Sequence, residues 1–223
     1  MSEQPISDDV AEFSPHRRKR FSMILDLIDR TCRGKSDIHI LDIGGTYGYW
    51  KALEPMWRDR PLRFTLINLK AETVDDPRFV SLAGDACSMP QFDDDSFDLV
   101  HSNSVIEHVG RWQQMKKMAA EVRRLAPAYY LQTPAFGFPI EPHFRAPLFH
   151  WLPDSIRIGL IMRFSIGFYP RAKTLDEAMS YFEDAILLDR RRMEALFPDA
   201  RLVKERYLGL TKSFVVIRDG RAP

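Results

Sequence analysis

The sequence predicts an α/β protein with a doubly wound, mostly parallel seven-stranded sheet, an antiparallel last strand and an inserted cap. Three observations predict this class. Short apolar segments alternate with amphipathic ones over the first 133 residues, as in parallel sheets covered by helices on both faces. A segment rich in prolines and aromatic residues then interrupts the alternation. Two strand-like segments with a link of only two to four residues follow, and so short a link makes them antiparallel.

The composition excludes several classes of protein. Hydrophobic residues make up 45% and charged residues 28% of the 223 residues, which excludes a wholly disordered or fibrous chain. The net charge of +1 supplies no field that would attract nucleic acid. Two cysteines are too few for a disulfide scaffold. No apolar run reaches the roughly 18 residues of a membrane span. We therefore expect a cytoplasmic protein with reduced thiols.

The first predicted helix begins at Ser14 and Pro15, because serine caps a helix well and proline suits its first position. It continues to about Cys32, and Gly34 ends it. A helix to about Trp57 follows the first strand. Another is predicted by an apolar stripe between Trp112 and Leu125. The five predicted strands of the core are 38–43, 63–68, 78–82, 97–102 and 128–133.

The predicted organisation has four parts. Residues 1–34 form a tail and a helix, and 35–133 form the core that carries the strand-end loops. Residues 134–182 are too long and too apolar for a simple loop and are interpreted as an inserted cap. Residues 183–223 hold a helix near 184–197 and two antiparallel strands that complete the sheet.

The most informative motif follows the first strand and reads Asp42-Ile43-Gly44-Gly45-Thr46-Tyr47-Gly48. Glycines in such a turn let the backbone approach a ligand closely. A dinucleotide-binding loop needs a glycine where Ile43 stands, and a Walker loop needs a Gly-Lys-Ser/Thr ending that is absent. A turn capped by Asp42 without a ligand is the structural alternative.

The remaining pattern, D-x-G-G-x-x-G, resembles the first motif of class I S-adenosylmethionine (SAM) dependent methyltransferases. Gly84-Asp85-Ala86 resembles the family's adenine-contacting loop, and the stretch from Phe97 to Val109, with its Glu107-His108 pair, resembles the fourth-strand signature. The resemblance covers about residues 36–133 and is nearest to the small-molecule branch similar to quinone-biosynthesis enzymes (methyltransferase type 11). It implies a Rossmann-like fold, a methyltransferase activity and SAM as cofactor.

The resemblance also implies the cofactor-binding residues. They are Asp42, Gly44, Gly45, Thr46, Gly48, Asn68, Leu69, Gly84, Asp85, Ala86, Ser102 and Asn103. The second strand departs from the family pattern, because it ends in Asn68 where an acidic residue should chelate the ribose hydroxyls. An amide could still bind one hydroxyl, and Glu72 is a possible substitute.

Two histidines are the candidates for a catalytic base if the acceptor is protonated. His108 follows the fourth strand and His143 lies in the cap, and an unperturbed histidine has a suitable pKa near 6.5. Either one can instead be structural. Some relatives hold a divalent cation with a Glu-x-x-Glu-His cluster. Ser104 occupies the first glutamate position here, so we expect no metal.

The expected acceptor is a small molecule methylated on oxygen or nitrogen. The cap resembles, over about 20 residues, methyltransferases of surface-polysaccharide and secondary-metabolite pathways, which points to a saccharide or a secondary metabolite. The alternatives are a methyltransferase for RNA or protein and a SAM-binding protein without catalysis. No nucleic-acid partner is expected, and the apolar cap predicts a peripheral membrane contact.

Overall fold

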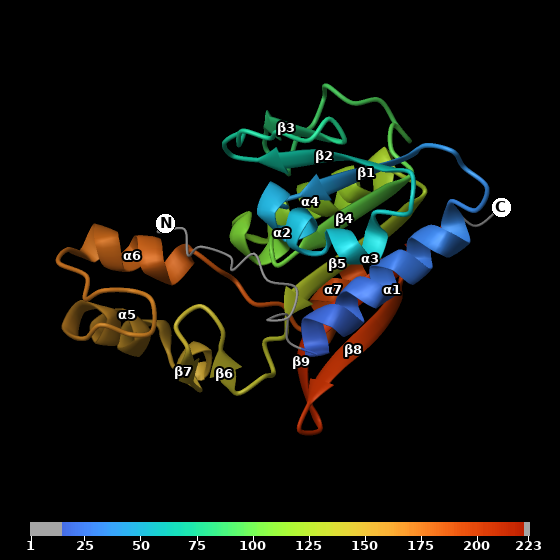
Figure 1. Ribbon diagram of the computed structural model, residues 1–223. Coiled ribbons are helices and arrows are strands. Elements are labelled where there is room, and N and C mark those ends of the chain that lie inside the picture. Colours follow the sequence, from blue (N-terminus) through green and yellow to red (C-terminus); the bar gives the residue numbers. More distant parts are fainter. Residues whose placement is uncertain (1–14, 221–223) are drawn as a thin grey trace. The chain divides into compact units, whose positions relative to one another are not determined.

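The computed structural model describes residues 15–220, with side chains from Arg18 onward. Figure 1 shows the helices and strands. The helices are α1 (Pro15–Thr31), α2 (Tyr47–Ala52), α3 (Glu54–Trp57), α4 (Trp112–Leu125), α5 (Asp154–Arg163), α6 (Leu175–Glu183) and α7 (Arg190–Leu196), with 3₁₀ turns at Ile106–His108 and Phe149–Trp151. The strands are β1 (Ile38–Ile43), β2 (Leu62–Asn68), β3 (Phe79–Ala83), β4 (Leu99–Asn103), β5 (Ala128–Pro134), β6 (Ile140–Glu141), β7 (Ala146–Pro147), β8 (Arg201–Tyr207) and β9 (Leu210–Asp219).

The main sheet has seven strands in the order β3-β2-β1-β4-β5-β9-β8. β1 pairs in parallel with β2 and with β4, and β2 pairs in parallel with β3. Strand order therefore reverses between β1 and β4, the switch point where such sheets bind ligands. Leu208 and Gly209 both have positive φ, 49° and 82°, as a two-residue hairpin turn between antiparallel strands requires. The predicted fold class is confirmed.

Two helices differ from their predicted bounds. The helix expected to reach Trp57 is divided at Leu53 into α2 and α3. Pro55 in the first turn of α3 has no N–H to continue the α2 ladder, and its ring disfavours an uninterrupted helix. The helix expected over 184–197 begins only at Arg190, because the side chain of Asp189 caps it by accepting a hydrogen bond from the Arg192 backbone N–H at 2.9 Å.

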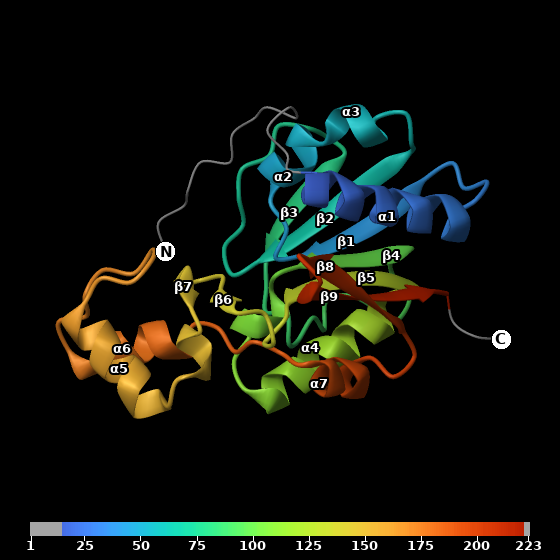
Figure 2. The same ribbon diagram turned by 90° about the horizontal axis from the view of Figure 1, so that it is seen from below.

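The chain divides into two compact units. In the first, which comprises residues up to 103, 119–131 and 217 onward, α1, α2 and α3 lie on one face of β1 and β2 and the second half of α4 lies on the opposite face (Figure 2). Apolar side chains from these helices are fully buried, including Phe21, Trp50 and Val122. Helices on both faces leave the strand ends as the accessible part of this unit.

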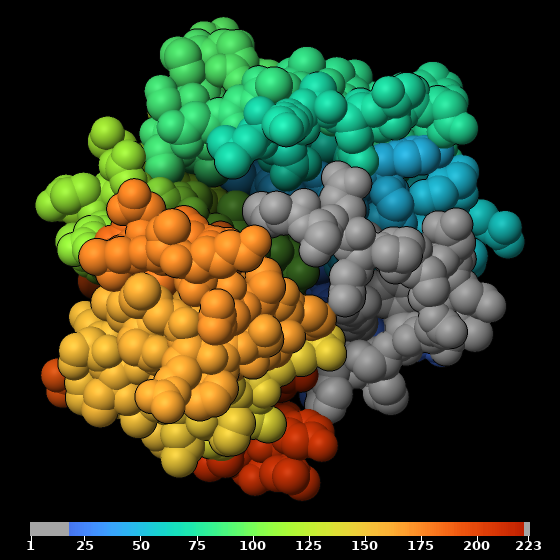
Figure 3. Space-filling view, turned by 90° about the vertical axis from the view of Figure 1, so that its left-hand side faces the viewer, coloured from blue at the N-terminus to red at the C-terminus, as the bar shows by residue number. Residues whose placement is uncertain are grey.

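The second unit comprises residues 104–118 and 132–216. It contains the β6–β7 hairpin, α5 and α6, and a separate apolar core. The Phe144 ring packs 4.5 Å from Phe149 and 4.6 Å from Tyr169. Figure 3 shows the surface of residues 134–182, which belong to this unit, in yellow and orange. Among the described residues, no helix is both long enough and apolar enough to cross a bilayer.

Candidate functional site

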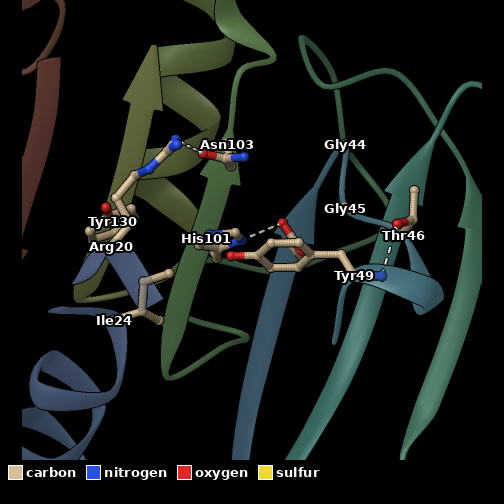
Figure 4. Close-up of a pocket in the computed structure, with 10 residues that line it drawn as sticks. Arg20, Ile24, Gly44, Gly45, Thr46, Tyr49, His101, Asn103 and Tyr130 are labelled. Carbon is tan, nitrogen blue, oxygen red and sulfur yellow. Dashed lines mark hydrogen bonds and ion pairs between the residues drawn. The ribbon is translucent and has the colours of Figure 1, made fainter. Parts of the chain in front are cut away.

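A cavity of about 230 Å³ lies at the carboxyl ends of β1 and β4 in the first unit. Figure 4 shows its lining side chains, which come from α1, from β1 and the loop after it, from α2, and from β4 and β5. The lining residues are Arg20, Ile24, Asp42, Gly44, Gly45, Thr46, Tyr49, His101, Asn103 and Tyr130. The cavity therefore lies at the switch point of the sheet.

Asp42 is the anchor of the loop after β1. Its carboxylate is fully buried and accepts hydrogen bonds from the Trp50 indole N–H at 2.6 Å and the His101 Nδ1–H at 2.7 Å. A carboxylate can accept only, so the His101 proton is on Nδ1 and the lone pair on Nε2. That Nε2 atom is buried and has no hydrogen-bond partner among the described residues.

The fold requires glycine at positions 44, 45 and 48 to different degrees and for different reasons. Gly44 has φ +76°, which favours glycine, and its N–H donates to the Ile67 carbonyl at 2.7 Å. A Cβ atom on Gly45 would lie 1.7 Å from Asp42 Oδ2. Thr46 caps α2 by accepting from the Tyr49 backbone N–H at 3.2 Å. A Cβ atom on Gly48 would meet nothing within 4 Å, so the fold itself requires Gly44 and Gly45 more than Gly48.

Asn68 supports this loop from the end of β2. Its side-chain N–H₂ donates to the Gly45 carbonyl at 2.6 Å. Glu72, the possible substitute at the ribose, accepts from the Tyr47 backbone N–H at 2.5 Å. Both side chains hold the backbone of the glycine loop, which explains why an amide, a donor as well as an acceptor, is suitable at position 68.

This contact changes what Asn68→Asp should do. From the family pattern alone, aspartate should retain or strengthen SAM binding. In the fold, a carboxylate has no proton to donate to the Gly45 carbonyl, and two acceptors would face each other. We expect Asn68→Asp to weaken SAM binding several-fold and to lower the melting temperature, measured by calorimetric titration and thermal unfolding. Asn68→Gln serves as the comparison that keeps the amide. Tighter binding by Asn68→Asp would show that the residue faces the ribose.

The other predicted cofactor residues lie at neighbouring strand ends. The Gly84 N–H donates to the Asn68 carbonyl at 2.8 Å, and the exposed Asp85 accepts from the Cys87 N–H at 2.8 Å. Leu69 is 87% exposed. Along with Gly48, Ala86 and Ser102, these residues are outside the cavity lining. Ser102 is buried and donates to the Ile43 carbonyl at 3.0 Å, whereas Asn103 lines the cavity and accepts from Arg20 at 3.3 Å.

Three of the residues that line the cavity could not be predicted as site residues from the sequence. Ile24 belongs to the apolar stripe of α1, Tyr49 lies within α2, and Tyr130 lies within β5, so each resembles a core residue. Arg20 belongs to the basic run 16–20, whose first two side chains are outside the described ones. His101 is buried within β4 and also lines the cavity.

The two candidate bases belong to one cluster in the second unit. One ligand-type atom from each of Glu107, His108 and His143 lies within 4.8 Å of the others. The two imidazole rings contact edge to face at 4.8 Å. Burial raises the pKa of Glu107. Burial lowers the pKa of His143, but its hydrogen bond to Glu141 and nearby acidic charges outweigh this and raise the pKa above the usual value. Neither histidine is an isolated group.

Part of the chain is similar to a known protein family. Residues 41–127, from β1 to just beyond α4, match the family model described as "Methyltransferase domain" (Methyltransf_11). This part of the chain, less than half of the 223 residues, is therefore similar to a methyltransferase domain. The glycine loop and the cavity at the switch point both include residues of this part. No match is found among curated proteins.

Solved structures share the fold of this chain. A phosphoethanolamine N-methyltransferase 2 of Haemonchus contortus, in complex with SAM, is 18% identical with a TM-score of 0.50, over 82% of this chain and 38% of that one. The CurJ carbon methyltransferase is 14% identical with a TM-score of 0.56, over 95% and 56%.

A geranyl diphosphate C-methyltransferase from Streptomyces coelicolor A3(2) was solved with Mg²⁺, geranyl diphosphate and S-adenosyl-L-homocysteine. It is 14% identical with a TM-score of 0.52, over 92% of this chain and 80% of that one. The present chain thus spans little more than a third of the first of these relatives and just over half of the second.

Proposed function

We propose that the protein is a SAM-dependent methyltransferase that acts on a small-molecule acceptor. The observation that carries the proposal is the glycine loop after β1, where Gly45 lies directly over the Asp42 carboxylate in a domain that matches the methyltransferase model. The compact loop keeps the Asp42 carboxylate at the wall of the cavity, and a carboxylate there favours a cationic ligand.

The residues around the cavity fit the amino-acid end of SAM. The Asp42 carboxylate and the unpartnered His101 Nε2 are acceptors for an ammonium group, and the Arg20 guanidinium is a counter-charge for a carboxylate. At about 230 Å³ the cavity is smaller than the roughly 300–1,000 Å³ typical for whole ligands. The adenosine end would therefore extend along Asn68, Leu69 and the Gly84–Ala86 loop, outside the cavity.

When bound, SAM supplies an electrophilic methyl group for in-line displacement. The chain's own contribution is to hold the cofactor in one orientation and to keep water away from the acceptor. Alignment of this kind can contribute about 7–11 kcal/mol to a rate enhancement. His108 and His143 share a cluster with a buried carboxylate, so we assign neither of them as a separate general base.

Two features support a small acceptor over a macromolecule. The net charge is +1, without the basic excess that RNA binding favours. Aromatic residues of the segment 134–182, among them Phe144 and Phe149, form a core of their own, which suits a rigid wall for a small ligand. An RNA or protein methyltransferase and a SAM-binding protein without catalysis stay alternatives. Release of S-adenosyl-L-homocysteine with a panel of small hydroxyl and amino compounds, against RNA and protein acceptors, distinguishes the three.

A peripheral membrane contact through the cap stays a prediction. Exposed apolar side chains on α5 and the loop after it support it, together with Arg163 beside Phe164. Co-sedimentation with anionic vesicles, compared between wild type and Phe164→Ser, would detect such a contact.

A further inference from the structure

A second group of polar side chains lies close together in the second unit, outside the lining of the cavity after β1. Glu107 follows β4 in the 3₁₀ turn Ile106–His108, His108 is its neighbour, and His143 comes from the loop between β6 and β7. One ligand-type atom of each lies within 4.8 Å of the others. The sequence pattern indicates only the Glu107-His108 pair, because His143 is 35 positions beyond His108.

The Glu107 carboxylate is buried and only partly satisfied by hydrogen bonds among the described residues. Its side chain has no exposed surface, and one carboxylate oxygen, Oε2, accepts from the Thr133 hydroxyl at 2.9 Å. The other oxygen, Oε1, is buried without any hydrogen-bond partner among the described residues. A buried, half-satisfied carboxylate is costly unless a cation or a donor completes it.

Both histidines are oriented to offer a lone pair. His108 Nδ1 lies 2.7 Å from the Asp184 backbone carbonyl, and His143 Nδ1 lies 2.8 Å from the Glu141 carboxylate. Carbonyl and carboxylate oxygens only accept, so in the neutral form of each imidazole Nδ1 carries the proton and Nε2 carries the lone pair. A histidine fixed through Nδ1 by a carbonyl or carboxylate is the usual arrangement around a metal-ligating Nε2.

The residues behind the histidines are themselves held in place. The Glu141 side chain is buried, and its second oxygen accepts from the Phe144 backbone N–H. The Ile186 N–H donates to the Glu107 carbonyl at 2.8 Å, which fixes the backbone of the turn beside Asp184. All of these residues belong to the second unit, so the arrangement depends on that unit alone.

We propose that Glu107, His108 and His143 bind one divalent first-row transition-metal ion, such as Zn²⁺, and leave a coordination position open. Two imidazole nitrogens with one carboxylate suit Zn²⁺ and its neighbours, whereas Mg²⁺ and Ca²⁺ prefer oxygen ligands only. Three protein ligands with one open position are typical of zinc sites that bind water or a substrate oxygen. The proposal does not rest on SAM binding.

The test is a metal titration of the full-length protein after dialysis against EDTA. Zn²⁺ is added in competition with a chromophoric chelator, and Co²⁺ is added separately while its visible absorption is recorded. We expect one Zn²⁺ per chain with a Kd of micromolar or lower, a Co²⁺ spectrum with nitrogen-ligand bands, and a higher melting temperature with Zn²⁺. Folded wild-type protein that binds no Zn²⁺, even at a Zn²⁺ concentration 100-fold above this Kd, would overturn the proposal.

Variants distinguish Zn²⁺ binding at this site from Zn²⁺ binding at other histidines. His143→Ala should lower Zn²⁺ affinity at least 100-fold, and Glu141→Gln, which keeps the ligands but weakens the support of His143, should lower it about 10-fold. Glu107→Gln is nearly isosteric, so it should fold and yet lose the Zn²⁺-induced rise in melting temperature. His150→Gln is the matched control, because His150 lies in the same unit and outside the cluster. If His143→Ala and Glu107→Gln bind Zn²⁺ as the wild type does, the assignment is wrong.

Discussion

Gly45→Ala is expected to lower SAM affinity at least tenfold, which corresponds to about 1.4 kcal/mol or more. The added methyl carbon would lie 1.7 Å from Asp42 Oδ2 and 2.1 Å from Asp42 Cγ. Asp42 cannot move aside freely, because it is buried and bonded to both Trp50 and His101. The loop must therefore shift away from the cavity that it lines. Calorimetric titration with SAM and thermal unfolding measure the two consequences.

Two further variants test this reason for the effect. Gly48→Ala adds the same methyl group three residues further on, in the first turn of α2, but meets no atom within 4 Å, so it should lose less stability than Gly45→Ala. In an Asp42→Ala background the obstructing carboxylate is gone, and the additional loss of stability from Gly45→Ala should shrink. Equal losses with and without Asp42 would show that another contact limits position 45.

Gly167→Ala should destabilise the second unit by about 2–4 kcal/mol. Gly167 has φ +59°, and a Cβ atom there would lie 1.9 Å from the Phe144 carbonyl oxygen and 2.4 Å from its carbon. Both obstructing atoms are backbone, so no side-chain rotation can relieve the overlap. Phe144 is also in the centre of the small apolar core. Chemical denaturation and limited proteolysis of the segment 134–182 are the measurements.

Gly159→Ala is the matched control for Gly167→Ala. Gly159 lies within α5, and a Cβ atom there meets nothing within 4 Å. Alanine is the better helix former by up to about 1 kcal/mol, so this variant should be as stable as the wild type or slightly more stable. If Gly167→Ala unfolds at the same denaturant concentration as Gly159→Ala, the packing described around Phe144 is contradicted.

The strands and the loop after β1 could be predicted from the sequence, because both depend on local patterns. Short segments of five to seven residues that are rich in apolar side chains define β1 to β5, and glycines next to an aspartate define the turn. The bounds of α7 depended on Asp189 as a cap, a residue that is equally common inside turns.

Contacts between distant residues could not be predicted in the same way. The ribose contact of Asn68 stays a prediction. Its hydrogen bond to the Gly45 carbonyl had no signal in the sequence, because only the pairing of β1 with β2 brings the two residues together. Tyr49 and Tyr130 looked like core residues because nothing local distinguishes an aromatic that faces a cavity. His143 reaches Glu107 only because the chain folds back after β5.

The measurement that tests the central claim most directly is a calorimetric titration of the folded protein with S-adenosyl-L-homocysteine. The demethylated cofactor avoids turnover and keeps the amino-acid and adenosine ends that the strand-end residues are proposed to hold. We expect binding of one molecule per chain, no displacement by NAD, and a clear loss in Gly45→Ala. Protein that is folded by circular dichroism and gives no heat with either S-adenosyl-L-homocysteine or SAM would contradict the proposed function.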